Sequence, residues 1–478
     1  MSNSLAYYLR KYGGITRNDI VPIISDRSPY YILGILGISK AGGAYLPIDS
    51  KLPIDRIQYI LEEVNPKMIL YNNTQNIIEK LLLSNENLKL YNVQKHNYKS
   101  NINSIENINE TDDICYVLFT SGTTGKPKGV LISHFNINNY TRKFDGSSQF
   151  DNIYNLIKKE NVHNILGITN FSFDASQTEI IVSLVNGLKI ILVDELMSND
   201  IILLSKYITE NNVEFINTTP TRFKLFMEYD EFKNAVNNIK MIYLGGESLS
   251  MNLCKYIKEY SNCSIYNSYG PTECTVDASI KLINESENNY ITIGKPIRNC
   301  NIYILDKYFK PVPIGVEGEI FIGGYGVGKG YLNREELTKE KFIENPFNFD
   351  NDKHNEIIYR TGDLGKWTLH GEIEYLGRID FQVKIHGQRI ELEEIESTIK
   401  EVKGIEDSVV IDKVKENGDK YLVCYYVKNN DNQIVKGKDI RNYLKNKLPL
   451  YMVPNYFKNI NNIPITINGK LDKKALPE

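Results

Sequence analysis

The sequence predicts an α/β fold in at least two domains, and three observations lead to this prediction. The chain has 478 residues, which is too many for one ordinary hydrophobic core. Short apolar strands alternate with amphipathic helices over most of its length, a pattern that favours stacked α/β layers. Polar residues and glycines follow the strand ends, where open α/β sheets bind ligands.

The elements are expected in the following order. Helices are predicted at 1–14, 30–44, 391–402 and 437–449. Strands that end in polar loops are predicted at 19–26, 66–72, 114–118, 129–134, 164–174, 213–220, 239–246 and 264–270. From about residue 300 the strands are short and closely spaced, at 301–306, 318–324 and 371–380, which predicts a β-subdomain. A small α+β unit follows, with strands in 381–390, 407–414 and 420–428. We therefore expect a large domain at 1–379 and a small one at 380–478.

Composition and charge exclude several classes of protein. The chain is 42% hydrophobic and 24% charged, as soluble globular proteins are. A net charge of -3 gives no general attraction to nucleic acid or to an anionic membrane. The most apolar stretch, 180–193, is too short and too polar to span a bilayer, and no signal-peptide pattern is present. The six scattered cysteines lack a C-x-x-C pair, which predicts reduced thiols in a cytoplasmic protein.

The segment FTSGTTGKPKG at 119–129 has the composition of a phosphate-binding loop. Its glycines allow close backbone approach to an anion, its hydroxyls can donate hydrogen bonds, and its lysines can neutralise charge. It is not a Walker A loop, because no Gly-Lys pair in the chain is followed by Ser or Thr. The alternative, a flexible surface turn, is less consistent with three glycines, a proline and a following strand.

Three further motifs contain residues suited to catalysis or binding, and each also has a purely structural interpretation. In NSYGPTEC (267–274), Glu273 is suited to bind Mg²⁺, or Thr272 and Glu273 simply begin a helix. In YRTGDL (359–364), Asp363 can accept from both hydroxyls of a ribose, or it is an ordinary turn aspartate. In INGKLD (467–472), a hairpin turn projects Lys470, or that lysine is merely solvated.

In combination and order, these segments closely resemble the adenylation domains of nonribosomal peptide synthetases, within the adenylate-forming superfamily. The resemblance covers nearly the whole chain. It rests on KAGGAYLPID (40–49), LFTSGTTGKPKGV (118–130), FDAS (173–176), NSYGPTE (267–273), GEIFIGGYGVGKGYLNR (318–334), YRTGDL (359–364), GRIDFQVKIHGQRIELEEIE (377–396), LPLYMVP (448–454) and NGKLD (468–472). The chain departs from the family at His386, where an arginine is usual, and at Glu393, where a glycine is usual.

The resemblance implies a two-step reaction. An amino-acid carboxylate attacks the α-phosphate of ATP, which gives aminoacyl-AMP and pyrophosphate. The phosphopantetheine thiol of a peptidyl carrier protein then takes the aminoacyl group, after the small mobile domain has rotated about Asp380. A condensation domain is a further expected partner, the product belongs to antibiotic-type peptide biosynthesis, and the piece itself is expected to be monomeric. The chain is expected to be excised from a larger synthetase or trimmed at its start.

The resemblance also implies a role for each site residue. Lys470, Thr272 and Glu273 are the catalytic residues: Lys470 bridges the substrate carboxylate and the ribose oxygens, Thr272 contacts the α-phosphate, and Glu273 holds Mg²⁺. The phosphates contact Thr120, Ser121, Gly122, Thr123, Thr124, Gly125 and Lys128. The nucleoside contacts Gly246, Glu247, Asn267, Tyr269, Gly270, Asp363 and Arg378. The amino acid contacts Asp174, Ala175, Thr178, Asn217, Tyr243, Gly245, Ser268, Val276 and Asp277.

Asp174 indicates the class of acid. By the resemblance it pairs with an α-ammonium, and acyl-CoA synthetases have no such group, so a buried carboxylate there would be costly. The polar pocket residues, Asp277 above all, favour a polar amino acid, with lysine or ornithine first and a hydroxyl or amide side chain second. The alternatives are an acyl- or aryl-CoA ligase of the same superfamily and a non-catalytic domain that still binds nucleotide.

Two motifs are rejected as decoys. LGGES (244–248) resembles the phosphopantetheine site of a carrier protein, but it ends a predicted strand, so Ser248 is expected to be unmodified. GGYGVGKGY (323–331) suggests G-x-G-x-x-G without the βαβ unit that a dinucleotide site requires.

Overall fold

The computed structural model describes residues 1–84, 88–122, 125–144, 151–284, 290–380, 382–385, 387–415, 419–429, 435–464 and 471–477. The chain forms two compact units. The first comprises Met1–Ser50, Glu63–Phe119 and Gly129–Asp380. The second comprises Lys51–Glu62, Thr120–Lys128 and Phe381–Glu478.

The first sheet of the first unit has six strands in the order β4-β3-β1-β2-β5-β6. The pairs β4/β3, β3/β1, β1/β2 and β2/β5 are parallel. Apolar residues fill both faces of β1, as expected for a parallel strand covered on two sides. The strands are β1 (Ile20–Ser25), β2 (Ala44–Ile48), β3 (Ile69–Asn72), β4 (Leu90–Asn92), β5 (Ile114–Thr120) and β6 (Lys128–Ser133).

Five helices accompany this part of the first unit: α1 (Ser2–Lys11), α2 (Pro29–Ala41), α4 (Gln75–Ser84), α5 (His134–Thr141) and α6 (Ile153–Lys159). Helix α2 starts with Pro29 at its first position, where the missing N–H costs nothing. It ends at Gly42, whose φ of 107° is a left-handed cap. The predicted helix over 30–44 is therefore too long, and its last residue, Ala44, begins strand β2 instead.

The second sheet has seven strands in the order β13-β12-β11-β10-β9-β7-β8. From β8 to β11 the pairs are parallel, and β12 and β13 continue the sheet antiparallel. The strands are β7 (Asn164–Gly167), β8 (Lys189–Leu192), β9 (Phe215–Thr218), β10 (Met241–Gly245), β11 (Ser264–Tyr269), β12 (Ser279–Leu282) and β13 (Lys295–Pro296).

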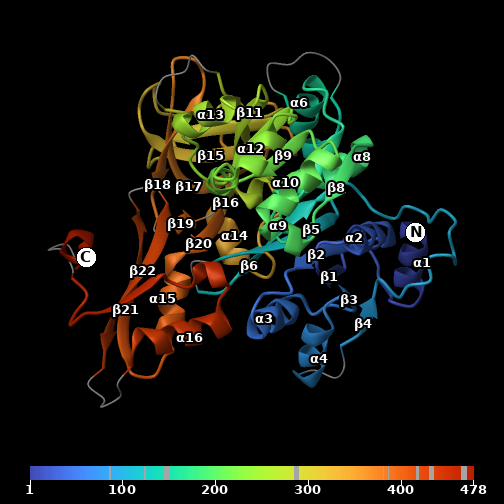
Figure 1. Cartoon of the computed structure of the whole chain (residues 1–478), viewed down its shortest axis with the longest axis horizontal. Coiled ribbons are helices and arrows are strands. Elements are labelled where there is room, and N and C mark those ends of the chain that lie inside the picture. The colour runs from blue at the N-terminus through green and yellow to red at the C-terminus, as the bar shows by residue number, and fades with distance from the viewer. Residues whose placement is uncertain are drawn as a thin grey trace. The chain divides into compact units, whose positions relative to one another are not determined.

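Helices α10, α12 and α13 lie over one face of the second sheet (Figure 1). Their apolar residues, such as Leu204, Phe232 and Leu253, share a buried cluster with Ile216 and Ile242 of the strands. The other face joins a core that also contains residues of the first sheet. The helices here are α7 (Ser176–Glu179), α8 (Ile181–Asn186), α9 (Glu195–Asn199), α10 (Ile201–Glu210), α11 (Pro220–Phe226), α12 (Asp230–Val236) and α13 (Met251–Lys258), with the 3-10 turn η1 (Thr272–Cys274).

An antiparallel sheet completes the first unit and confirms the predicted β-subdomain. Its order is β14-β15-β17-β16, with β18 paired to β17, and helix α14 (Glu335–Lys341) precedes β16. The strands are β14 (Cys300–Leu305), β15 (Gly318–Gly324), β16 (Phe342–Glu344), β17 (Ile357–Trp367) and β18 (Ile373–Arg378). The alternative of a turn at Asp363 is wrong, because β17 continues through it. Its pairing with β15 shifts register there, and Gly362 has a φ of 74°, as at a bulge.

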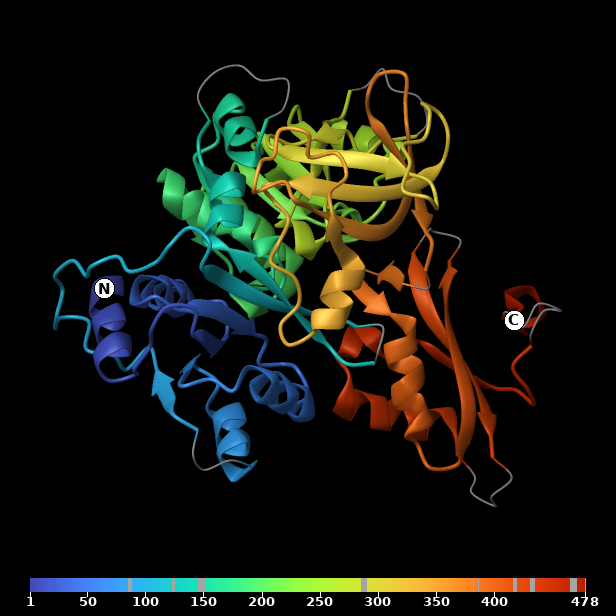
Figure 2. The same cartoon turned by 180° about the vertical axis from the view of Figure 1, so that it is seen from behind.

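The second unit contains most of α3 (Ile54–Val64), the hairpin β19 (Gln382–Ile385) and β20 (Gln388–Glu391), and a three-stranded sheet. In that sheet β21 (Ile405–Val414) and β22 (Lys420–Lys428) are antiparallel, and β23 (Tyr456–Asn459) runs parallel to β22. Helices α15 (Leu392–Lys400) and α16 (Gly437–Lys447) pack on one face of the sheet (Figure 2). The short turns are η2 (Leu450–Met452) and η3 (Lys473–Ala475). This is the predicted small α+β arrangement.

Candidate functional site

The predicted amino-acid residues of the first unit lie at the carboxyl ends of its parallel strands. Asn217 is the next-to-last residue of β9, Gly245 is the last residue of β10 with Tyr243 two residues before it, and Ser268 is the next-to-last residue of β11. Asp174 lies in the loop that follows β7. Gly245 pairs with Ser268, and a Cβ at Gly245 would lie 2.3 Å from the Ser268 hydroxyl, so a larger residue would require that side chain to move. Ligands of open α/β sheets bind at this edge.

Asp277 is the centre of a buried cluster of hydroxyl groups. The Tyr140 hydroxyl donates to Asp277 Oδ2 over 2.6 Å, and the Tyr243 hydroxyl donates to the same oxygen over 2.9 Å. The Tyr140 hydroxyl also lies 2.7 Å from Thr178 Oγ1. Burial raises the pKa of Asp277 to about 6, although hydrogen bonds from Tyr140, Tyr243 and Ser268 work in the opposite direction.

The backbone around Asp277 is unusual. Thr275 and Val276 have φ values of 60° and 73°, which is left-handed backbone that β-branched residues rarely adopt. The Thr275 hydroxyl donates to the carbonyl of Gly326, which holds this turn. On the opposite side of the cluster, the Asn217 amide donates to the Ala175 carbonyl over 3.0 Å and so fixes the start of α7.

Thr272 and Glu273 are adjacent in the 3-10 turn η1, but their side chains have different partners. The Thr272 hydroxyl donates to Asp174 Oδ2 over 2.6 Å. The Glu273 side chain is fully buried, and its Oε1 accepts a hydrogen bond from the Tyr331 hydroxyl over 2.8 Å. The structure thus brings the predicted phosphate residue Thr272 against the predicted ammonium residue Asp174.

A second cluster forms around Asp363, on the bulge of β17. The Tyr269 hydroxyl donates to Asp363 Oδ2 over 2.6 Å, and Arg378 Nη1 donates to Oδ1 over 2.9 Å. Arg378 Nε and Nη2 each donate to the carboxylate of Asp380 over 2.6 Å. One guanidinium therefore bridges Asp363, a predicted ribose residue, and Asp380, the predicted hinge.

The remaining predicted nucleoside residues lie on β10, β11 and the loops after them. Gly246 follows β10 with a φ of 80°, and the Glu247 carboxylate accepts from the backbone N–H of Thr221 over 3.2 Å. The Asn267 amide donates to the Thr292 carbonyl over 3.0 Å. Asn267 and Tyr269 share one face of β11 and Ser268 faces the other, because strand side chains alternate. A Cβ at Gly270 would collide with the Val276 carbonyl.

In the second unit, the described part of the predicted phosphate loop contacts β20 and α15. The Ser121 hydroxyl donates to the Arg389 carbonyl over 2.8 Å. The Gly122 N–H donates to the Glu394 carboxylate over 3.3 Å, and Glu394 also forms a 2.6 Å ion pair with Arg56. The loop approaches α15 closely at Gly125, which has a φ of 78° and where a Cβ would lie 2.5 Å from the Ser397 hydroxyl.

Two further loop residues have buried polar groups. The Thr120 hydroxyl has no hydrogen-bond partner among the described residues, and the side chain of Lys128 is buried on β6. Thr123, Thr124, His386 and Lys470 lie outside the described residues. Asp380 is the last residue of the first unit, and its role as a hinge stays a prediction.

Sequence reasoning missed Tyr140, Tyr331 and the Arg56–Glu394 pair. Tyr140 lies in helix α5 and belongs to none of the motifs, whereas Tyr331 lies within the 318–334 segment of the resemblance, which assigned it no role. The only available signal was their residue type, since a buried tyrosine hydroxyl usually has a hydrogen-bond partner. Arg56 and Glu394 are 338 positions apart, and no spacing rule connects them.

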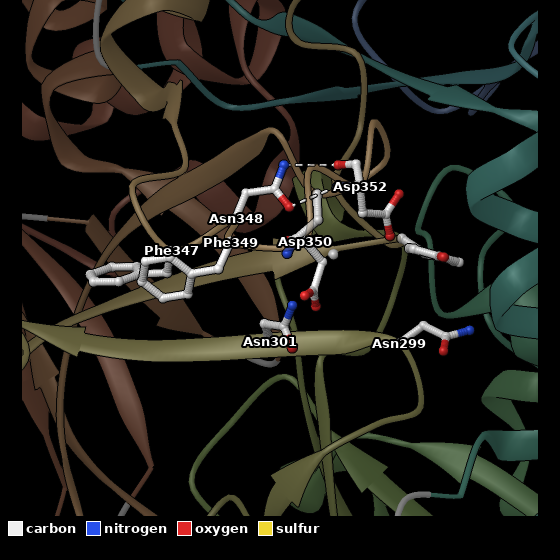
Figure 3. A pocket seen from close by; sticks show the side chains of 10 residues that line it. Asn299, Asn301, Phe347, Asn348, Phe349, Asp350 and Asp352 are labelled. Carbon is white, nitrogen blue, oxygen red and sulfur yellow. Dashed lines mark hydrogen bonds between the residues drawn. The ribbon is translucent and has the colours of Figure 1, made fainter.

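A pocket of about 240 Å³ lies elsewhere in the first unit, beside β14 and the segment between β16 and β17. Figure 3 shows Asn299, Asn301, Phe347 and Asp350 around it. None of the predicted site residues lines this pocket. Within the described residues, no group of three or more His, Cys, Asp or Glu side chains could hold a metal ion. We assign this pocket no role in catalysis.

Two further observations concern membrane-spanning helices and disulfide bonds. No helix in the described part of the chain is long and apolar enough to cross a membrane. None of the six cysteines, all of which lie within the described residues, forms a disulfide bond, and five of them are buried.

Comparison with known proteins places these clusters in a family. The family model described as "AMP-binding enzyme" matches residues 1–332, and "AMP-binding enzyme C-terminal domain" matches residues 394–470. Gramicidin S synthase 2 of Aneurinibacillus migulanus is 38% identical over 478 residues, which are the whole of this chain and 10% of that protein. Surfactin synthase subunit 3 of Bacillus subtilis is 37% identical over 481 residues, covering 100% of this chain and 36% of that protein. The chain thus spans a small part of these relatives.

Solved structures agree with the sequence matches. A four-domain nonribosomal peptide synthetase bound to AMP and glycine has a TM-score of 0.67 and 33% identity, covering 100% of this chain and 34% of its own. A peptide synthetase protein with adenylation and carrier domains has a TM-score of 0.82 and 24% identity, covering 99% and 77%. The expected resemblance to adenylation domains, the α/β fold and the classification as an enzyme are confirmed. The chain belongs to the AMP-binding enzyme family.

Proposed function

We propose that this chain activates an amino acid with ATP and then passes it to the phosphopantetheine thiol of a carrier protein. One observation carries the proposal. The hydrogen bond from Thr272 to Asp174 joins the residue predicted at the α-phosphate to the residue predicted at the α-ammonium. The amino-acid carboxylate and the phosphorus that it attacks would therefore meet at this pair of side chains.

The first step is a substitution at phosphorus. A carboxylate oxygen of the amino acid forms a bond to the α-phosphorus, and the bond from that phosphorus to the bridging oxygen of the β-phosphate breaks. Pyrophosphate leaves with the electron pair, so no residue of the protein needs to act as a nucleophile. The two reacting groups, a carboxylate and a triphosphate, are both negatively charged, so positioning and charge neutralisation dominate catalysis. We assign positioning to Asp174 and Thr272.

The cluster around Asp363 suits a ribose. Tyr269 and Arg378 each donate one hydrogen bond to the carboxylate, and Tyr375 donates a longer one over 3.4 Å. A carboxylate has about four acceptor positions, so the position that remains, together with the one that Tyr375 holds only weakly, can accept from the two ribose hydroxyls. Gly246, Glu247, Asn267 and Gly270 would surround the adenine.

Glu273 suits Mg²⁺ in the manner common for nucleotide enzymes. Mg²⁺ prefers hard oxygen ligands and often binds through one carboxylate together with substrate phosphates. The Tyr331 hydroxyl occupies one acceptor position of Glu273 and orients the carboxylate. When bound, the ion supplies positive charge against the phosphates.

The loop 120–128 would hold the β- and γ-phosphates. The Thr120 hydroxyl is buried without a partner among the described residues, so it can donate to a phosphate oxygen. The same phosphates are proposed to contact Ser121, Gly122, Gly125 and Lys128. Two further hydroxyl donors are expected from Thr123 and Thr124. Lys470 is proposed to bridge the substrate carboxylate and the ribose oxygens.

The amino acid itself is proposed to be polar, with lysine or ornithine first and a hydroxyl or amide side chain second. The buried polar groups of Asn217, Thr178, Ser268 and Asp277 favour such a substrate, because a polar side chain can exchange hydrogen bonds with them and an ammonium group would supply a counter-charge to Asp277. Ala175, Gly245 and Val276 contribute the small and apolar part of the lining.

The second step requires partners from outside the chain. We propose a peptidyl carrier protein, with a condensation domain as a neighbour, since one similar solved structure is a four-domain nonribosomal peptide synthetase and another contains adenylation and carrier domains. We also propose that domains 1–379 and 380–478 move about Asp380 between the two steps.

Amino-acid-dependent exchange of labelled pyrophosphate into ATP tests the proposal. Lys470→Ala should nearly abolish exchange while thermal unfolding stays that of the wild type. Lys473→Ala, three residues further along, is the matched control and should retain exchange. Undiminished exchange in Lys470→Ala would refute the role of Lys470. Formation of acyl-CoA from fatty or aryl acids would instead favour the CoA-ligase alternative.

A further inference from the structure

Tyr140 lies at the centre of the amino-acid cluster although no motif includes it. It belongs to α5, which begins directly after β6 with a capping box of Ser133 and Asn136. Tyr140 is 1% exposed, and its hydroxyl contacts both Asp277 and Thr178. The helix therefore delivers one buried hydroxyl to the carboxylate and leaves little freedom in its position.

Asp277 is held by neutral donors and lacks a counter-charge. It is 6% exposed, and its hydrogen bonds come from Tyr140, Tyr243 and Ser268. No Lys, Arg or His of the described residues forms an ion pair with it. A buried carboxylate is costly unless its charge is compensated, so the protein alone does not complete this site.

Asp174 belongs to the same electrostatic environment. Its charge acts on Asp277, Tyr140 and Tyr116. Asp174 is half-buried whereas Asp277 is buried, so the two carboxylates differ in depth. Thr178 belongs to the short helix α7, which follows Asp174 in the chain, and its hydroxyl lies 2.7 Å from the Tyr140 hydroxyl that also donates to Asp277.

Tyr116 supplies an independent sign that a polar ligand belongs here. It is fully buried on β5, and its hydroxyl has no hydrogen-bond partner among the described residues. Buried hydroxyls without partners are rare in folded proteins. A ligand bound at Asp174 would offer the Tyr116 hydroxyl a polar neighbour.

We propose that the substrate is a short α,ω-diamino acid whose side-chain ammonium pairs with Asp277, and that Tyr140 is a specificity-determining residue that holds Asp277 for it. This inference rests on the proposed adenylation of an amino acid at Asp174. A second ammonium group neutralises the second carboxylate, whereas an amide or hydroxyl would donate a hydrogen bond and leave the charge. Tyr140 and Tyr243 both donate to Asp277, and their buried rings occupy space beside the carboxylate. We therefore favour a short side chain, such as that of ornithine or 2,4-diaminobutyrate, over a longer one.

Pyrophosphate exchange with a panel of acids tests the substrate class. The panel contains ornithine, 2,4-diaminobutyrate, lysine, glutamine, threonine, leucine and norvaline, which is ornithine without its terminal amine. A short diamino acid should give the highest kcat/KM, at least about 100-fold above norvaline. Preference for threonine, glutamine or leucine would overturn the inference and leave adenylation intact. Absence of exchange with every amino acid would overturn the proposed function as well.

Two variants test the assigned residues through the ratio of kcat/KM for ornithine to that for norvaline. Asp277→Asn keeps the shape and an acceptor for the tyrosines, and the ratio should fall by about 100-fold. Tyr140→Phe should lower it about tenfold through the KM for ornithine. Tyr45→Phe is the matched control, because its buried hydroxyl donates to Gln177 instead, and the ratio should not change. An unchanged ratio in Asp277→Asn, or an equal fall in Tyr45→Phe and Tyr140→Phe, would overturn the assignment.

Discussion

Asp363 offers the sharpest test of the nucleotide assignment, through the substitution Asp363→Asn. The carboxylate accepts from Tyr269 over 2.6 Å and from Arg378 over 2.9 Å, and it is proposed to accept from two ribose hydroxyls. A hydrogen bond to a charged group contributes about 1.5–3 kcal/mol, and one between neutral groups about 0.5–1.5 kcal/mol. Loss of the charge should therefore cost about 1–1.5 kcal/mol for each ribose hydroxyl.

For two hydroxyls, the cost of about 2–3 kcal/mol corresponds to a fall of about 30- to 150-fold in kcat/KM for ATP. Pyrophosphate exchange would be measured with ATP and with 2′,3′-dideoxy-ATP for the wild type and the variant. Because the analogue lacks both hydroxyls, the variant should lose almost nothing further with it. An equal loss with ATP and with the analogue would show that Asp363 supports only the fold and does not bind the ribose hydroxyls.

Three further outcomes follow from other contacts. Arg56→Met should destabilise the second unit by about 3–5 kcal/mol, since it leaves Glu394 buried without its cation. The double variant Arg56→Met/Glu394→Met should unfold at a higher temperature than Arg56→Met alone. The reverse order of thermal stability would contradict this prediction. The kcat/KM for a diamino acid should fall as the pH drops below about 6, because burial raises the pKa of Asp277 to about 6 and the protonated carboxyl carries no charge. In Asp277→Asn this fall at low pH should disappear. If the fall persisted, it would belong to the titration of another group. Glu273→Gln keeps an acceptor for Tyr331 and should raise the Mg²⁺ concentration required for exchange at least about tenfold, so an unchanged Mg²⁺ titration would count against Glu273 as a ligand.

The α/β layers, the β-subdomain and the small α+β unit were predictable, because apolar periodicity and glycine positions mark strands and helices. The end of α2 and the start of β2 were not, because Gly42 caps the helix only two residues before a short strand begins. At Gly362 the sequence could not distinguish a β-bulge from a turn, because a glycine followed by an aspartate is common in both structures.

The site residues that belong to sequence motifs were predictable, whereas the contacts between residues far apart in the sequence were not. Thr272 and Asp174 each belong to a motif, but their contact joins segments 98 positions apart. Tyr140 lies 137 positions from Asp277, on a helix whose sequence suggests only packing. Side chains of this kind are identified by tertiary contact, because nothing in the local sequence distinguishes them from ordinary core residues.

In the proposed reaction, Asp174 and Thr272 hold an α-amino acid for adenylation. The most direct measurement is pyrophosphate exchange with the preferred amino acid, compared with the same acid lacking its α-amino group. We expect exchange with the amino acid and a loss of at least about 100-fold for the des-amino acid, since Asp174 would then face no ammonium. Equal exchange with both acids, or exchange with fatty or aryl acids only, would contradict it.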